Sequence, residues 1–115
     1  MRIILRKERP MTQNVFYSGI HWNKRREEAQ RVHDLVKAHI KPEYPLFTKK
    51  VDISIVAYFD KYPFDSDNIM AKIYIDGLKP RLIQNDSHEY VGFVSTKSEV
   101  DKANPRVEIL IKECE

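Results

Sequence analysis

The chain has 115 residues, a length that fits one domain spanning residues 1–115 around a single hydrophobic core. Apolar residues make up 42% and charged residues 32% of it, and no apolar run is long enough to cross a bilayer, which argues against a membrane role. The N-terminus lacks the apolar stretch of a secretory signal, and the single cysteine, Cys114, allows no internal disulfide. We therefore expect a cytoplasmic protein.

Charge is distributed unevenly along the chain. Residues 1–50 carry 12 Lys and Arg against 5 Asp and Glu, whereas residues 51–115 carry 8 against 12. The formal net charge of +3 is small, so this asymmetry says more than the total. A basic half that can hold phosphates is followed by a half that concentrates carboxylates.

The apolar pattern predicts four strands and two main helices. Residues 10–22 contain Pro10, Asn14, Ser18 and Gly19 and are expected to form a long loop. Asn23 is the expected N-cap of the first helix. In chain order we expect a strand at 3–5, a helix at 23–40, a strand at 51–59, a helix at 69–78, and strands at 90–96 and 106–112. This order, β-α-β-α-β-β, predicts a single α+β domain in which two main helices pack on a mixed β-sheet.

Two carboxylates stand where the third predicted element gives way to the next helix. In an extended backbone, residues two apart point the same way, so Asp65 and Asp67 would converge. Close carboxylates repel unless a cation lies between them, and oxygen ligands select a hard ion such as Mg²⁺ or Mn²⁺. On spacing alone, a helix N-cap with a solvated neighbour is the commoner reading of Asp-x-Asp.

The longer pattern around these residues changes that balance. Asp65-Ser66-Asp67-Asn68 is followed by Lys72, by Asp76-Gly77-Leu78 and by Asp86, and it is preceded by the segment from Pro10 to Tyr17 and by His21-Trp22. Together these residues resemble the RusA family of Holliday-junction resolvases and its phage and prophage relatives. The resemblance spans nearly the full chain.

The resemblance implies a metal-dependent endodeoxyribonuclease that cleaves four-way (Holliday) junctions during DNA recombination and repair. It implies that Asp65, Asp67 and Asp86 are the catalytic carboxylates that bind Mg²⁺, with Mn²⁺ as a possible substitute, and that Lys72 is the catalytic lysine. The chain departs from the best-known member at two points. Lys72 lies one residue later after Asp67, a shift that rotates a helical side chain by about 100°. The segment from Asp60 to Phe64 replaces the basic run that this member has before its first aspartate.

A four-way junction has two strands to cut symmetrically, so one active site per chain predicts a two-fold homodimer bound to branched DNA. Lys24, Arg25, Arg26 and Arg31 are the expected DNA-binding residues, because helical spacing can align some of them along one face. A merely solvated charged face is the alternative interpretation.

Other residue types receive more modest expectations. The histidines show no zinc-binding spacing, and we expect His33 and His39 to be surface residues or hydrogen-bonded polar ones. Phe16, Tyr17 and Trp22 can stack on unpaired bases, although aromatic residues near a helix start more often fill the core. With three glycines and no Gly-rich phosphate loop, we expect no nucleotide cofactor.

Two other functions compete with the nuclease. One is a non-catalytic protein of the same fold that binds branched nucleic acid, with carboxylates that lack productive metal geometry. The other is an Asp-x-Asp phosphohydrolase for small molecules, which usually requires a longer chain and a second motif. Cleavage assays on junction and linear duplex with chelation controls separate these hypotheses.

Overall fold

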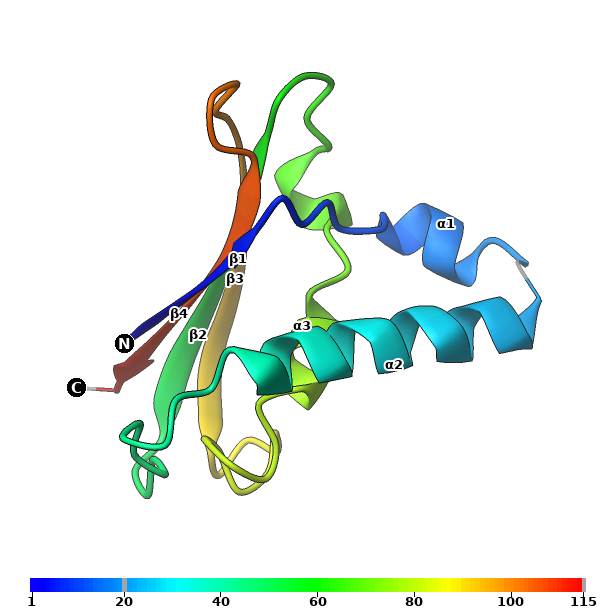
Figure 1. Ribbon diagram of the computed structural model, residues 1–115. Helices are drawn as coiled ribbons and strands as arrows, with labels where there is room; N and C mark the ends of the chain where they lie inside the picture. Colours follow the sequence, from blue (N-terminus) through cyan, green and yellow to red (C-terminus); the bar gives the residue numbers. More distant parts are fainter. Residues whose placement is uncertain (20, 115) are drawn as a thin grey trace.

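The computed structural model describes residues 1–19 and 21–114 as one α+β domain (Figure 1). Its elements in chain order are β1 (Arg2–Arg6), α1 (Gln13–Tyr17), α2 (Trp22–Ala38), β2 (Val51–Phe59), the 3₁₀ helix η1 (Ser66–Asn68), α3 (Ala71–Asp76), β3 (Val91–Val100) and β4 (Arg106–Glu113). No helix in these two stretches is both long and apolar enough to span a membrane.

The four strands form one mixed sheet in the order β1-β4-β2-β3. β4 pairs antiparallel with β1 and β2, whereas β2 pairs parallel with β3. Parallel neighbours cannot be joined by a tight turn, so residues 60–90 make a long crossover that carries η1 and α3. The predicted α+β class and element order are confirmed, although β3 extends to Val100 rather than ending at residue 96.

The core lies between the sheet and α2. Buried and half-buried residues alternate along the whole of β2, as the period-two pattern predicts, and its buried side chains face the helices. α2 lies on this side of the sheet and contributes Val32 and Val36, which are both fully buried (Figure 1). Burying each such aliphatic side chain contributes about 1.5–3 kcal/mol relative to leaving it in water.

The prediction of a second main helix at 69–78 is wrong. The chain instead forms η1, two residues in a different conformation, and the short helix α3. Ile69 and Met70 leave the helical path because Ile69 forms an antiparallel bridge with Thr12, and the Met70 amide donates to the carbonyl of Met11. A partner nearly sixty residues away along the chain thus overrides local helical periodicity. The fold has one main helix and several short ones.

The predicted loop at 10–22 also contains structure. The Thr12 hydroxyl accepts a hydrogen bond from the Val15 amide and caps α1, a helix of five residues. α2 begins one residue before the expected N-cap Asn23, because the His21 Nδ1 accepts from the Asn23 amide and takes the capping role. The earlier start of α2 places Trp22 in its first turn.

Candidate functional site

The turn that carries Asp65 and Asp67 is tied to the sheet on one side. The Thr96 hydroxyl of β3 donates to the Ser66 carbonyl, and the Ser98 amide donates to the Ser66 hydroxyl at 3.0 Å. Both contacts come from the edge strand that follows the crossover. The position of η1 is therefore set by β3, some thirty residues later in the chain.

The N-terminal segment holds the same turn on its other side. The Asn14 amide donates to Asn68 Oδ1 at 3.2 Å, and Gln13 Nε2 donates to the Ile69 carbonyl at 3.3 Å. The bridge between Thr12 and Ile69 continues this contact. Two segments that the sequence pattern singled out, far apart along the chain, thus lie side by side.

Asp65 and Asp67 are exposed, but the extended backbone expected for both is found for only one of them. Asp65 is the extended N-cap residue of η1, whereas Asp67 lies inside the 3₁₀ turn. Side chains in a 3₁₀ helix repeat every three residues, so two positions at a spacing of two do not share a face. The expectation that alternation makes the two carboxylates converge therefore does not apply to this turn.

Asp86 belongs to a compact cluster of two carboxylates and two ammonium groups. Lys79 Nζ lies 3.3 Å from Asp86 Oδ2 and 3.3 Å from Asp76 Oδ1. Lys72 Nζ lies 3.8 Å from Asp86 Oδ2 and 3.5 Å from Asp76 Oδ1. Lys72 and Asp86, both assigned to the active site by the resemblance, are thus neighbours, and Lys72 also pairs with Asp76 four residues later in the same helix.

The charges in this cluster stabilise one another. Partial burial disfavours the ionised form of Asp86, but the neighbouring Lys79, helped by Lys72, outweighs this effect and lowers the pKa of Asp86. Burial likewise disfavours charged Lys79, yet Asp76 and Asp86 raise its pKa. Both shifts favour a charged Lys79 ammonium next to a charged Asp86 carboxylate.

A surface cavity of about 290 Å³ joins this cluster to the N-terminal segment. Gln13, Lys72 and Asp86 line it, together with the apolar side chains of Ala71, Ile75, Val91 and Val94. Gln13 is also the residue whose amide reaches Ile69, directly after η1. The cavity therefore lies between the lysine–carboxylate cluster and the turn that bears Asp67.

The chemistry of the three predicted ligands suits Mg²⁺, since all are carboxylates, but their placement does not complete a site. Within residues 1–19 and 21–114, no group of three His, Cys, Asp or Glu side chains is arranged to hold a metal ion. Asp86 faces Lys72 and Lys79 instead of Asp65 and Asp67. Binding of one ion by all three carboxylates would therefore require Asp86 to leave the two lysines and these side chains to move together.

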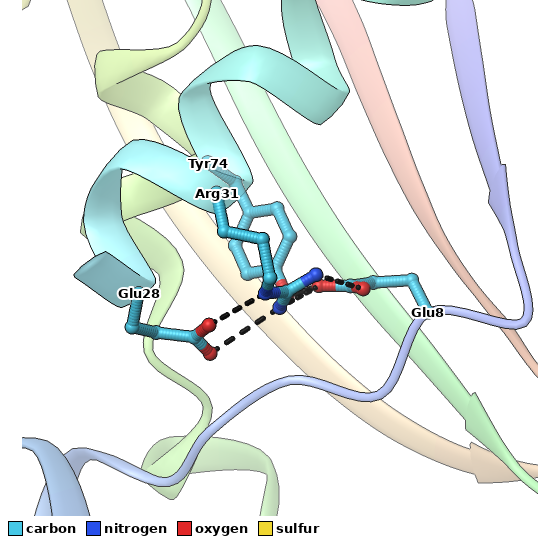
Figure 2. Close-up of polar contacts among 4 residues, drawn as sticks. All are labelled: Glu8, Glu28, Arg31 and Tyr74. Atoms are coloured by element: carbon cyan, nitrogen blue, oxygen red, sulfur yellow. Dashed lines mark hydrogen bonds and ion pairs between the residues drawn. The ribbon is translucent and has the colours of Figure 1, made fainter. Parts of the chain in front are cut away.

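Arg31, expected to contact DNA, is committed to an intramolecular network (Figure 2). Its guanidinium binds both carboxylate oxygens of Glu8 at 2.9 Å and donates from Nε to Glu28 at 2.6 Å. The buried Tyr74 hydroxyl donates to the same Glu8 carboxylate at 2.7 Å. The Arg31 charge is therefore balanced by Glu8 and Glu28 within the fold, and its role in DNA binding stays a prediction.

The other three expected DNA-binding residues, Lys24, Arg25 and Arg26, lie in the first turns of α2. Lys24 and Arg26 are exposed, Arg25 is half-buried, and the guanidinium of Arg26 lies 5.3 Å from the centre of the Trp22 ring. Their placement is compatible with the predicted role in phosphate binding, which remains a prediction.

Sequence reasoning missed Lys79. It lies three residues after Asp76 and seven after Lys72, a spacing that would align all three on one helical face. Gly77 and Pro80 marked this region as a helix end, which hid the signal. His33 was also misjudged: its Nε2 is buried and has no hydrogen-bond partner in the described part of the chain.

Burial lowers the pKa of His33, and the nearby Asp76 carboxylate only partly opposes this effect. His33 on α2 therefore lies next to the lysine–carboxylate cluster.

Comparison with protein-family models, with curated proteins and with solved structures found no match to this chain, so its functional assignment rests on its own residues.

Proposed function

We propose that this protein is an endodeoxyribonuclease that cuts four-way junctions, with Mg²⁺ as its cofactor and Asp65, Asp67 and Asp86 as its essential carboxylates. The observation that carries the proposal is the docking of the N-terminal segment onto η1, beside a cavity that contains Asp86 and Lys72. The three separated parts of the sequence pattern that resembles junction resolvases are thereby neighbours in space.

The lysine–carboxylate cluster has charges suited to a phosphodiester. Hydrolysis builds negative charge on the phosphate oxygens while water attacks in line with the leaving oxygen. Lys72 is 62% exposed and can reach a phosphate, whereas Lys79 is 31% exposed and remains close to Asp86. Cations fixed next to the reacting group stabilise that charge without having to reorganise. We assign this role to both lysines.

The proposal is tested by cleavage of a synthetic four-way junction and of linear duplex, each with Mg²⁺ and with EDTA. Asp67→Asn is expected to abolish cleavage and to preserve or strengthen junction binding, because it removes one negative charge near phosphate. Asp60→Asn, the same change in the loop before η1, is the matched control and should cut normally. Full cutting by the Asp67 variant with Mg²⁺ present would end the proposal.

Lys79 provides a second test. Lys79→Gln is expected to slow cleavage by roughly 10²- to 10³-fold, the usual loss when one stabilising group of a transition state is removed. Lys102→Gln, an exposed lysine in the turn between β3 and β4, is the control. Equal rates for the two variants would remove Lys79 from the site.

The partner proposed for a symmetric cut is a second copy of the chain. Two strands of one junction must be cut, and each chain supplies one site. β3 is an edge strand of the sheet and exposes Phe93 at 80%, which gives one surface that a second copy could use. A sedimentation mass of a monomer on a bound junction would count against the dimer.

One observation favours a second candidate function, a non-catalytic protein that binds branched nucleic acid. The carboxylates in the described residues are not gathered into a three-ligand group. For this function, junction binding is expected to be strong and indifferent to chelation, with no cleavage in Mg²⁺ or Mn²⁺. The same assay therefore separates the two functions.

A further inference from the structure

Part of the molecule extends away from the sheet (Figure 1). This part, called the arm below, consists of α1 and residues 22–30 of α2. The only buried residues of α2 are Val32 and Val36, so the portion of the helix in the arm contributes no buried side chain. Because this segment packs so little, packing against the core does not explain which side chains it exposes.

The aromatic residues of the arm differ in how much of each side chain is exposed. Phe16 is 8% exposed and packs in the core, as aromatic residues near a helix start usually do. Tyr17 and Trp22 are instead 57% and 53% exposed. An exposed tryptophan gives up the large stabilisation that its burial would bring. The expectation that these aromatics fill the core therefore holds for Phe16 and fails for Trp22.

The Trp22 ring already takes part in stacking. The His21 ring lies 5.6 Å away at an interplanar angle of 28°, and the Arg26 guanidinium lies 5.3 Å from the ring centre. Flat rings and guanidinium planes are the groups that stack on unpaired nucleobases. The arm thus presents a stacking surface that a base can extend.

Positive charge surrounds this surface. Lys24, Arg25 and Arg26 follow Trp22 after Asn23, and the first turn of α2 contains no acidic residue to offset them. The helix dipole is also positive at this end, so the arrangement costs helix stability unless an anion approaches. Phosphate groups flanking an unpaired base meet this requirement.

A polar cavity on α2 includes Arg26, the residue whose guanidinium lies over the Trp22 ring. It is lined by Asn23, Arg26, Glu27 and Gln30, positions that share one face of α2 at intervals of three and four residues. Amide, guanidinium and carboxylate groups are the side chains that form hydrogen bonds with base edges. A base stacked on Trp22 therefore has donors and acceptors within the same surface.

We propose that the arm binds an unpaired DNA base by stacking it on Trp22, with its flanking phosphates held by Lys24 and Arg25. The inference rests on the proposed function for its choice of DNA, and it names the structural feature recognised: the unstacked bases at a branch, in preference to intact duplex.

The experiment uses the intrinsic fluorescence of Trp22, the only tryptophan in the chain. The full-length protein is titrated, with EDTA present, with a single-stranded oligonucleotide, a four-way junction with unpaired bases at its branch point, and a blunt duplex of equal length. We expect quenching with the single strand and the junction but not with the duplex. Equal quenching by all three, or quenching by none, would overturn the inference. The latter result would leave the arm to a protein partner.

Variants provide the second readout, with labelled DNA and fluorescence anisotropy. Trp22→Ala is expected to weaken single-strand binding by roughly 5- to 150-fold, whereas Trp22→Phe retains most of the affinity. Tyr62→Ala, which removes an aromatic side chain that is 76% exposed and lies outside the arm, is the matched control. Unchanged affinity in Trp22→Ala, with a normal circular dichroism spectrum, would refute stacking.

The base-stacking proposal and the nuclease proposal can fail independently of each other. Selective quenching by a protein that never cuts junctions supports the arm and rejects the nuclease. Efficient Mg²⁺-dependent cutting with no change in Trp22 fluorescence rejects the arm and supports the nuclease.

Discussion

Tyr74 is expected to contribute strongly to stability through a single hydrogen bond. Its ring is fully buried, and its hydroxyl donates to the Glu8 carboxylate at 2.7 Å (Figure 2). Burial, reinforced by the negative charge of Glu8, raises the pKa of Tyr74, so the hydroxyl remains a donor at every pH of interest. A hydrogen bond to a charged acceptor contributes about 1.5–3 kcal/mol. Tyr74→Phe removes this bond and leaves the ring in place.

The lower part of that range is the better expectation, because Arg31 continues to neutralise Glu8 in the variant. For a chain of this size, each kcal/mol corresponds to roughly 4 °C in Tm, so a loss of about 6–8 °C is expected. Urea denaturation followed by circular dichroism measures the loss in free energy of unfolding, and a thermal melt measures the loss in Tm. Tyr62→Phe is the control, at a tyrosine that is 76% exposed. In a Glu8→Ala background the same change should cost much less.

A Tyr74→Phe variant within about 0.5 kcal/mol of the wild type, the ordinary range of surface substitutions, would refute this reasoning. So would an equal loss with and without Glu8. Either result would mean that the network around Arg31 does not hold the segment after β1, α2 and α3 together.

Two further predictions concern the packing of α2 against α3. Burial lowers the pKa of His33, so the imidazole binds a proton more readily in the unfolded chain than in the folded one. The free energy of unfolding should therefore fall as the pH drops below about 6.5. His33→Gln should weaken this pH dependence in thermal melts at pH 7.5 and 5.5. Gly77→Ala should destabilise by about 1–3 kcal/mol in urea, because its Cβ would lie 2.9 Å from Cβ of the fully buried Val36; a neutral effect would show that the helices can separate freely.

Much of the fold could be predicted from short-range patterns. The alternation along β2 and the three- and four-residue spacing of α2 each depend on neighbouring residues, and both elements are present near their predicted bounds. The region after Asp67 was mispredicted because Ile69 pairs with Thr12, a contact that no local pattern encodes. Tertiary pairing overrides helix propensity where the two conflict.

The site was harder to predict for the same reason. Arg31 reads as a solvated or DNA-binding cation until Glu8, twenty-three residues earlier, is seen to take its charge. Lys79 lies beyond a predicted helix end and reaches Asp86 only through the folded crossover. Spacing identified the acidic residues, but their mutual distances depend on turns whose type the sequence did not reveal, above all the 3₁₀ turn at Asp67.

The central claim is that Asp65, Asp67 and Asp86 act on one divalent ion at the DNA backbone. The most direct measurement is a crystal of the full chain soaked in Mn²⁺, with anomalous scattering used to locate the ion. The proposal predicts one peak bound by carboxylate oxygens of Asp86 and of Asp67 or Asp65, with the ammonium of Lys79 moved away from Asp86. A structure in which Asp86 remains paired with both lysines, and in which no peak touches any of the three carboxylates at saturating Mn²⁺ concentrations, would contradict it.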